Sequence, residues 1–201
     1  MKPLVKRLLT QVAAVAALLV APAVPAQVPP SATEAAAYQG LHAAAHRGDL
    51  AAIQKLASDK AALQARDRAG RTPLHVASFA RQHLAVQALL QAGADPSALE
   101  QGRYDGTALI AAAHLGHDGV VRQLIKAGAP LDHVNNLHWT AVIEAIVLGD
   151  GGPRHQATLK ALLDAGASTQ LTDRSGATPL QLARARGYGT MVQMLQAAGA
   201  R

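Results

Sequence analysis

Thr72-Pro73-Leu74-His75 recurs along the chain at nearly constant spacing, and this recurrence is the strongest structural signal in the sequence. Related boxes stand at Thr107-Ala108-Leu109-Ile110, Thr140-Ala141-Val142-Ile143 and Thr178-Pro179-Leu180-Gln181, with successive spacings of 35, 33 and 38 residues. A degenerate form, Gln39-Gly40-Leu41-His42, lies 33 residues before the first box. A repeat of this length predicts small stacked units rather than one globular core.

Each part of the repeat has a physical reason. The threonine hydroxyl can cap a helix, and proline suits the first helical turn. Small residues after the box, such as Ala111 and Ala112, let a second helix pack closely. Apolar pairs indicate that second helix, and each is followed by a glycine that suits a left-handed helix end: Leu89-Leu90 with Gly93, Leu124-Ile125 with Gly128, Leu162-Leu163 with Gly166, and Leu195 with Gly199.

The box, the alanines after it and the later Leu-Leu-x-x-Gly-Ala together resemble the ankyrin-repeat family over residues 38–201. The resemblance implies an all-α solenoid of about five helix–turn–helix repeats with short β-turn fingers. We expect the repeats at about 38–66, 67–101, 102–134, 135–172 and 173–201. Neighbouring units then supply the core, because no single helix pair can bury its apolar face alone.

The N-terminus has a different pattern. Lys2, Lys6 and Arg7 precede an apolar run from Val12 to Ala21, and small residues follow it. This pattern predicts a secretory signal peptide over residues 1–26, cleaved after Ala26 or, as second choice, after Ala23. The alternative is an uncleaved membrane anchor, but the run is about half the length that a span needs. We therefore expect a periplasmic or secreted protein.

Residues 27–37 are expected to form a disordered tether and a helix lead-in. The stretch from Gln27 to Thr33 is rich in proline and uncharged. Ser31 or Thr33 is a candidate capping residue for a helix that runs through Glu34 to Tyr38.

The charge balance argues against a nucleic-acid partner. The full chain carries 19 basic and 13 acidic residues, and loss of the signal peptide would leave 16 basic residues against 13. That small surplus contains no run rich in Lys and Arg. The chain has no cysteine, which excludes disulfides and lipid attachment through a cysteine.

Two insertions interrupt the period. The finger from Pro96 to Tyr104 is two residues longer than the others, and the segment Gly149–His155 adds five residues between two helices. A glycine-rich loop can bind phosphate, but the Lys-Ser/Thr ending of a P-loop is missing here. We interpret the second insertion as a tolerated loop, with Pro153 starting the next helix.

Nine histidines raise the question of metal binding. His42 and His46 are spaced i, i+4, which would place two ligands on one helix face. The resemblance implies instead that His42 and His75 form hydrogen bonds between neighbouring repeats. No third ligand converges in the sequence and no nucleophile motif occurs, so we expect no metal, no cofactor and no enzymatic activity.

The five aromatic residues are informative because they are so few. Four of them, Tyr38, Phe79, Tyr104 and Trp139, fall at finger or inner-helix positions, and Tyr188 falls in a helix–helix turn. The resemblance implies that these positions line a concave groove for partners. Aromatic residues and arginine dominate interface hot spots. The predicted partner-binding residues are Tyr38, Arg47, Arg68, Arg71, Phe79, Arg103, Tyr104, His114 and Trp139.

The sequence thus predicts a monomeric, non-enzymatic scaffold of the bacterial cell envelope that binds another protein. The groove should prefer an acidic, partly apolar surface. For Phe79 and Trp139 the alternative is that they fill gaps between repeats. For the whole protein the alternative is a metal or haem carrier, or an assembly aid, that uses His42, His46 and His114.

Overall fold

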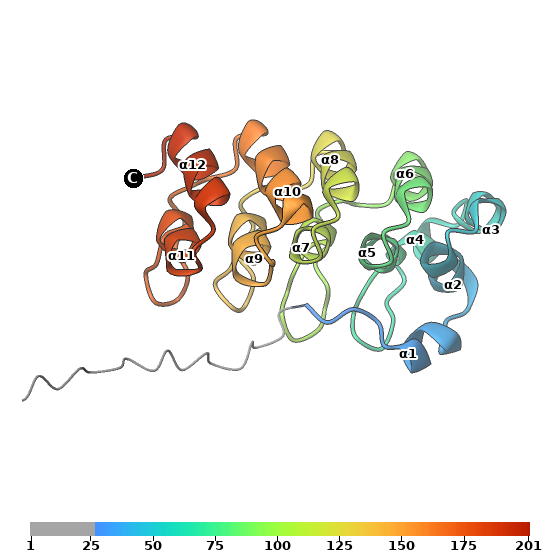
Figure 1. The fold of residues 1–201 in the computed structure, drawn as a ribbon. Coiled ribbons are helices and arrows are strands. Elements are labelled where there is room, and N and C mark those ends of the chain that lie inside the picture. The colour runs from blue at the N-terminus through green and yellow to red at the C-terminus, as the bar shows by residue number, and fades with distance from the viewer. Residues whose placement is uncertain (1–26) are drawn as a thin grey trace, which may run out of the picture.

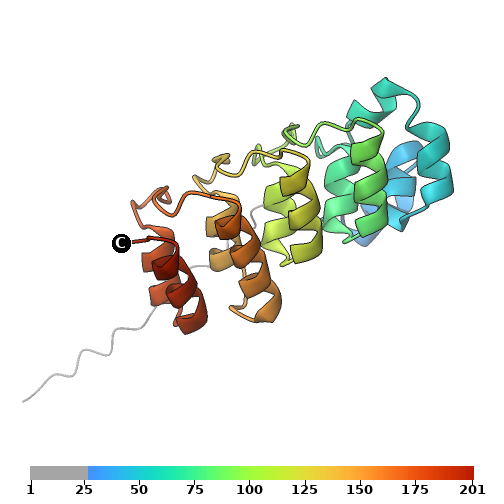
Figure 2. The ribbon, with the colours of Figure 1, turned by 90° about the horizontal axis from the view of Figure 1, so that it is seen from above.

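A computed structural model of the chain describes residues 27–201, and over that range the chain forms a row of helix pairs (Figure 1). The predicted signal peptide lies outside the described residues. Seen from above, the pairs stand side by side in a row (Figure 2). Between residues 27 and 201 the regular structure is helical, apart from one isolated antiparallel bridge between Leu99 and Thr107.

Five inner and five outer helices alternate along the chain. The inner helices are α2 (Gly40–Arg47), α5 (Pro73–Phe79), α7 (Ala108–His114), α9 (Ala141–Val147) and α11 (Pro179–Ala185). The outer helices are α3 (Leu50–Leu56), α6 (His83–Gln91), α8 (Asp118–Lys126), α10 (Pro153–Asp164) and α12 (Gly189–Ala197). Helix α1 (Ala32–Ala37) precedes the first pair, and α4 (Lys60–Gln64) follows α3. The predicted all-α solenoid is confirmed.

The box threonines begin the inner helices as expected. Thr72, Thr107, Thr140 and Thr178 each accept a hydrogen bond from the backbone N–H three residues later, at 3.3 to 3.4 Å. Each hydroxyl thereby satisfies a donor that the first helical turn leaves free. Four of the five outer helices, α6, α8, α10 and α12, end shortly before a glycine with positive φ, such as Gly93 at 97°. A side chain at that φ would be strained, so glycine ends the helix at low cost.

The core runs continuously through the stack. Inner helix α7 packs against α5 on one side and α9 on the other, and outer helix α8 covers it. Leu109, Ala112 and Leu124 in this unit are fully buried. Alanine on the inner helices allows the close approach, so each repeat completes the core of its neighbours.

The N-terminal segment differs from the expected disordered tether. Ser31 caps α1 through a capping box with Glu34, and the Val28 carbonyl accepts a hydrogen bond from Arg71 at 3.0 Å. The segment lies along the fingers that precede α5 and α7 (Figure 1). A donor 43 residues away therefore holds this segment, and the proline-rich composition gives no sign of it.

The Gly149–His155 insertion is a loop that hydrogen bonds hold in place. Pro153 is the first residue of α10, as the sequence predicts. His155 Nδ1 lies 2.8 Å from an Asp150 carboxylate oxygen, and the Tyr188 hydroxyl donates to the Gly149 carbonyl at 2.8 Å. The loop is therefore bonded to the last repeat. None of the helices between residues 27 and 201 is long and apolar enough to cross a membrane.

Candidate functional site

Three of the four fingers are turns that are each closed by one acidic or amide side chain. Asp67 Oδ1 accepts from the backbone N–H groups of Ala69 and Arg71, both at 2.9 Å. Asn135 and Asp173 close their fingers in the same way, and all three stand five residues before a box threonine. The finger that begins at Glu100 has two more residues before its threonine, and the bridge between Leu99 and Thr107 closes its base. Short fixed turns of this kind hold their tips at defined positions.

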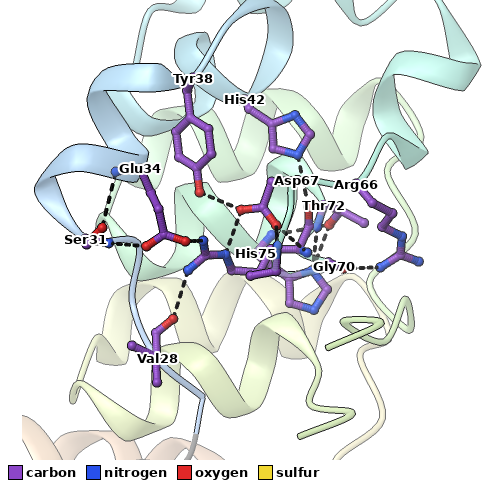
Figure 3. A network of polar contacts seen from close by, with 12 residues as sticks. Val28, Ser31, Glu34, Tyr38, His42, Arg66, Asp67, Gly70, Thr72 and His75 are labelled. Carbon is purple, nitrogen blue, oxygen red and sulfur yellow. Dashed lines mark hydrogen bonds and ion pairs between the residues drawn. The ribbon is translucent and has the colours of Figure 1, made fainter. Parts of the chain in front are cut away.

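A polar network joins the first two repeats to α1 (Figure 3). Arg71 is at the centre of this network. Its Nε donates to Asp67 Oδ2 at 2.7 Å and its Nη2 donates to Glu34 Oε1 at 2.8 Å. The Tyr38 hydroxyl donates to the same Asp67 oxygen at 2.6 Å. The guanidinium is thus paired with two carboxylates from different elements, although Arg71 is only 2% exposed.

The network keeps both carboxyl groups ionised. Hydrogen bonds from Ser31, helped by the charge of Arg71, lower the pKa of Glu34. Burial acts to raise the pKa of Asp67, but the bonds from Tyr38 and Arg71 outweigh it and hold that pKa below its usual range. Burial, together with the bond to Asp67, raises the pKa of Tyr38, which stays neutral. A buried arginine with such partners is well compensated.

Two hollows open along the fingers. One has a volume of about 350 Å³ and is lined by Tyr38, His42, Arg66 and Arg68 among others. The second, of about 330 Å³, is lined by Val28, Glu34, Arg68, Arg71, Arg103 and Tyr104 among others. The structure therefore brings together five of the nine predicted contact residues, and Arg68 borders both hollows.

The other four predicted residues line neither hollow. Arg47 is exposed at the end of α2, and Trp139 is half-buried immediately before Thr140. Phe79 and His114 are the last residues of α5 and α7.

Three of the nine predicted contacts are buried, and this corrects the expectation that their side chains face a partner. Arg71 is 2% exposed, Phe79 5% and Tyr104 7%. Arg71 is drawn inward by its carboxylate partners, and Tyr104 lies beneath Arg103, whose guanidinium carbon is 5.7 Å from the ring centroid. Phe79 fits the alternative that it fills a gap between repeats. Arg68, Arg103 and Arg47 are the exposed members of the set.

His114 instead belongs to a buried polar pair. Its Nδ1 lies 3.5 Å from Glu144 Oε2, and the other Glu144 oxygen accepts from Asn135 Nδ2 at 2.9 Å. Burial raises the pKa of Glu144 to about 8 and lowers the pKa of His114 to about 4. The pair is therefore uncharged near neutral pH, with the proton on the carboxyl group.

Several histidines form hydrogen bonds that join parts of the fold. His42 Nε2 lies 3.0 Å from the Arg71 carbonyl oxygen, and His75 Nε2 lies 3.1 Å from that of Gly106, so each ring joins two repeats. His46 packs near Tyr38, and His114 is two repeats away beside Glu144. Within residues 27–201 no group of three His, Cys, Asp or Glu side chains is arranged to hold a metal ion.

Sequence reasoning missed four acidic residues that shape this face: Glu34, Asp67, Glu100 and Glu144. Asp67 was detectable, because it shares its register with Asn135 and Asp173. Glu144 was also detectable, as a charged residue at a helix position that is otherwise apolar. Glu100 is buried, and this burial raises its pKa to about 7. The pairing of Glu34 with Arg71 spans 37 residues and leaves no local signal.

Comparison with known proteins gives consistent matches. A family model described as ankyrin repeats (3 copies) matches residues 3–100 and 96–173. The ankyrin repeat protein YahD of Escherichia coli (strain K12) is 33% identical over 189 residues, which cover 78% of this chain and 94% of YahD. Protein PhlB of Serratia liquefaciens is 36% identical over 137 residues, which cover 68% of this chain and 57% of PhlB. A solved ankyrin repeat domain from Acinetobacter baumannii AYE matches with a TM-score of 0.54 and 40% identity, covering 80% of this chain and 98% of that domain.

Proposed function

Because the chain belongs to the ankyrin-repeat family, we propose that it is a non-enzymatic scaffold of the bacterial cell envelope that binds another protein through its fingers and inner helices. Ankyrin repeats are protein–protein interaction domains. The family serves many partners, so the partner class has to be argued from this chain's own surface.

The observation that carries the proposal is the pair of exposed arginines on neighbouring fingers. Arg68 and Arg103 both border the hollow of about 330 Å³, which Tyr104 also lines. Two exposed guanidinium groups at one hollow favour a carboxylate-bearing, partly apolar protein surface, since arginine binds carboxylates in a bidentate manner.

The envelope location rests on the N-terminal pattern of basic, apolar and small residues over 1–26. Export would bring the folded repeats into contact with envelope proteins. Fixed fingers lose little conformational freedom on binding, so a groove of this kind can bind without prior rearrangement of its repeats.

Site-specific photo-cross-linking in intact cells tests the proposal. A photoreactive residue is placed at Arg68, at Arg103 or, as a control, at Arg122, which is exposed on the outer helix α8. We expect one envelope protein to be captured from the two finger positions and not from position 122. Equal capture from all three positions, or capture from position 122 alone, would contradict the proposed binding face.

A further inference from the structure

The N-terminal segment Gln27–Tyr38, which we call the lead-in, occupies the same face as the proposed partner. Its Val28 carbonyl and its Glu34 carboxylate both accept hydrogen bonds from Arg71, at 3.0 and 2.8 Å. Val28 and Glu34 also border the hollow that Arg68 and Arg103 share. The lead-in therefore covers part of the surface that a partner would use.

The start of the lead-in fits against Gly106 by shape. A Cβ atom at Gly106 would lie 1.8 Å from Gln27 Nε2, so a side chain at position 106 and the Gln27 side chain exclude each other. The Gly106 backbone does not have the positive φ that favours glycine. Close approach by the lead-in is therefore the reason that a side chain is not accommodated at position 106.

At the start of the lead-in, Gln27 buries polar atoms without hydrogen bonds to the described residues. Gln27 is fully buried, yet neither its side-chain nitrogen nor its side-chain oxygen has a hydrogen-bond partner among the described residues. Burying polar groups without partners is unfavourable. Val28, the next residue, is 49% exposed. The hydrogen bonds that hold the first part of the lead-in to the fingers are therefore those from Arg71, and Gln27 contributes packing against Gly106.

Arg71 is positioned independently of the lead-in. Asp67 belongs to the same finger and fixes both the backbone N–H and the Nε of Arg71. The two remaining guanidinium nitrogens point to the lead-in and take one main-chain carbonyl and one carboxylate. This donor set recognises a main-chain carbonyl together with a carboxylate, which in the lead-in comes from the first turn of α1.

We propose that the lead-in is an internal, displaceable occupant of the groove, and that the partner binds through an acidic segment whose carboxylate and main-chain carbonyl take the lead-in's place on Arg71 and beside Gly106. This inference rests on the proposed function and adds the class of partner and a mode of regulation. A segment tied to the same chain competes at an effective concentration of about millimolar for a short linker. Free partner therefore binds weakly while the lead-in occupies Arg71 (the closed protein) and strongly once the lead-in is released (the opened protein).

The test uses a labelled synthetic peptide with the sequence of residues 27–38 and measures its binding by fluorescence anisotropy. Glu34→Gln opens the protein, because it removes the charge that faces Arg71. A Gln side chain can still complete the capping box with Ser31. Asp164→Asn is the matched control, since it removes an exposed carboxylate that is paired with Lys160.

We expect the peptide to bind the Glu34→Gln chain at least tenfold more tightly than the wild-type chain or the Asp164→Asn control. A peptide with Gln at position 34 should not bind. Adding Gly106→Ala to Glu34→Gln should abolish binding in a variant with a wild-type circular dichroism spectrum.

Two outcomes would overturn the inference. One is no peptide binding by either Glu34→Gln or the Gln27→Gly, Glu34→Gln double variant. The other is a concentration-dependent dimer of the opened chain, which would assign the groove to a second copy. If the peptide binds as expected and the finger positions capture no protein in cells, the proposed function fails and the displaceable lead-in stands. If the finger positions capture a protein in cells and Glu34→Gln does not change that capture, the proposed function stands and the displaceable lead-in fails.

Discussion

Glu144 stands at a helix position where other repeats carry Val76, Ala111 or Leu182, so it is the residue that departs most from its register. Asn135 donates to one of its oxygens, and the other oxygen faces the His114 ring. A protonated carboxyl group can donate toward that ring, and this would satisfy two buried atoms that otherwise have no partner among the described residues. Asn135 thereby joins its finger to α9, and the neutral pair of Glu144 and His114 joins α9 to α7, with a stability that depends on pH.

The contribution of Glu144 to stability should fall as the pH rises from about 4.5 to about 8. The pKa of this carboxyl group is raised from 4.5 to about 8 in the folded chain. The unfolded state therefore releases its proton first, and the stability that the protonated form confers is lost over that window. Glu144→Gln keeps the shape and the neutral charge, so its unfolding free energy should vary less with pH.

Urea denaturation at pH 5 and pH 8.5 measures the Glu144 effect. Between pH 5 and pH 8.5 the unfolding free energy of the wild type should fall by more than about 1 kcal/mol relative to that of the variant, since one pKa unit corresponds to about 1.4 kcal/mol. Parallel pH profiles for wild type and variant would show that Glu144 titrates normally. Glu34→Gln serves as the comparison: the pKa of Glu34 is lowered, so its effect on stability falls below about pH 4.5, and this variant should run parallel to the wild type between pH 5 and pH 8.5.

The role of a side chain was predictable where its position in the repeat motif determines it. It was not predictable where its partners are distant in the sequence. The box threonines, the helix-ending glycines and the repeat-joining bonds of His42 and His75 follow from motif position. The inward direction of Arg71 depends on Glu34, 37 residues away, and on Asp67 in its own finger. A sequence shows that an arginine stands on a finger but does not show which carboxylates it meets.

Helices α7 and α8 form the central unit of the row, and each packs on neighbours at both sides. Their apolar periodicity and end signals are strong, which is why the helix pairs could be predicted. The N-terminal lead-in lacks such periodicity. Its order comes from bonds to Arg71 and a capping box, so composition alone predicted a disordered tether.

Leu124 tests the central packing. It is fully buried in α8, so Leu124→Ala should cost about 2–5 kcal/mol in unfolding free energy, through lost burial and a residual cavity. Leu84 in α6 is 62% exposed, and Leu84→Ala should cost less than about 0.5 kcal/mol. Equal costs in urea denaturation would contradict the assignment of Leu124 to the core.

The whole chain combines an N-terminal export pattern with a row of stacked repeats. The row was predictable because each repeat carries its own signals and each contacts only its neighbours. The two hollows and the covering by the lead-in depend on how repeats stack. The spacing of the repeat motifs along the sequence does not predict those features.

Export can be tested by intact-mass measurement of the protein isolated from the cell envelope. Cleavage after Ala26 predicts a mature chain that starts at Gln27, the first residue of the lead-in. A chain that retains Met1 as the main form would contradict the envelope location. A start at Val24 would instead mean that cleavage follows Ala23, our second choice.

The most direct test of partner binding through the fingers is the affinity of the captured partner for purified variants. Replacing Arg68 and Arg103 with alanine together should weaken binding at least tenfold, about 1.4 kcal/mol, because both exposed guanidinium groups face the groove. Arg122→Ala on the outer helix should leave the affinity unchanged, and all variants should keep the wild-type unfolding midpoint. Wild-type affinity in the double variant, or an equal loss in Arg122→Ala, would contradict a partner site on the fingers.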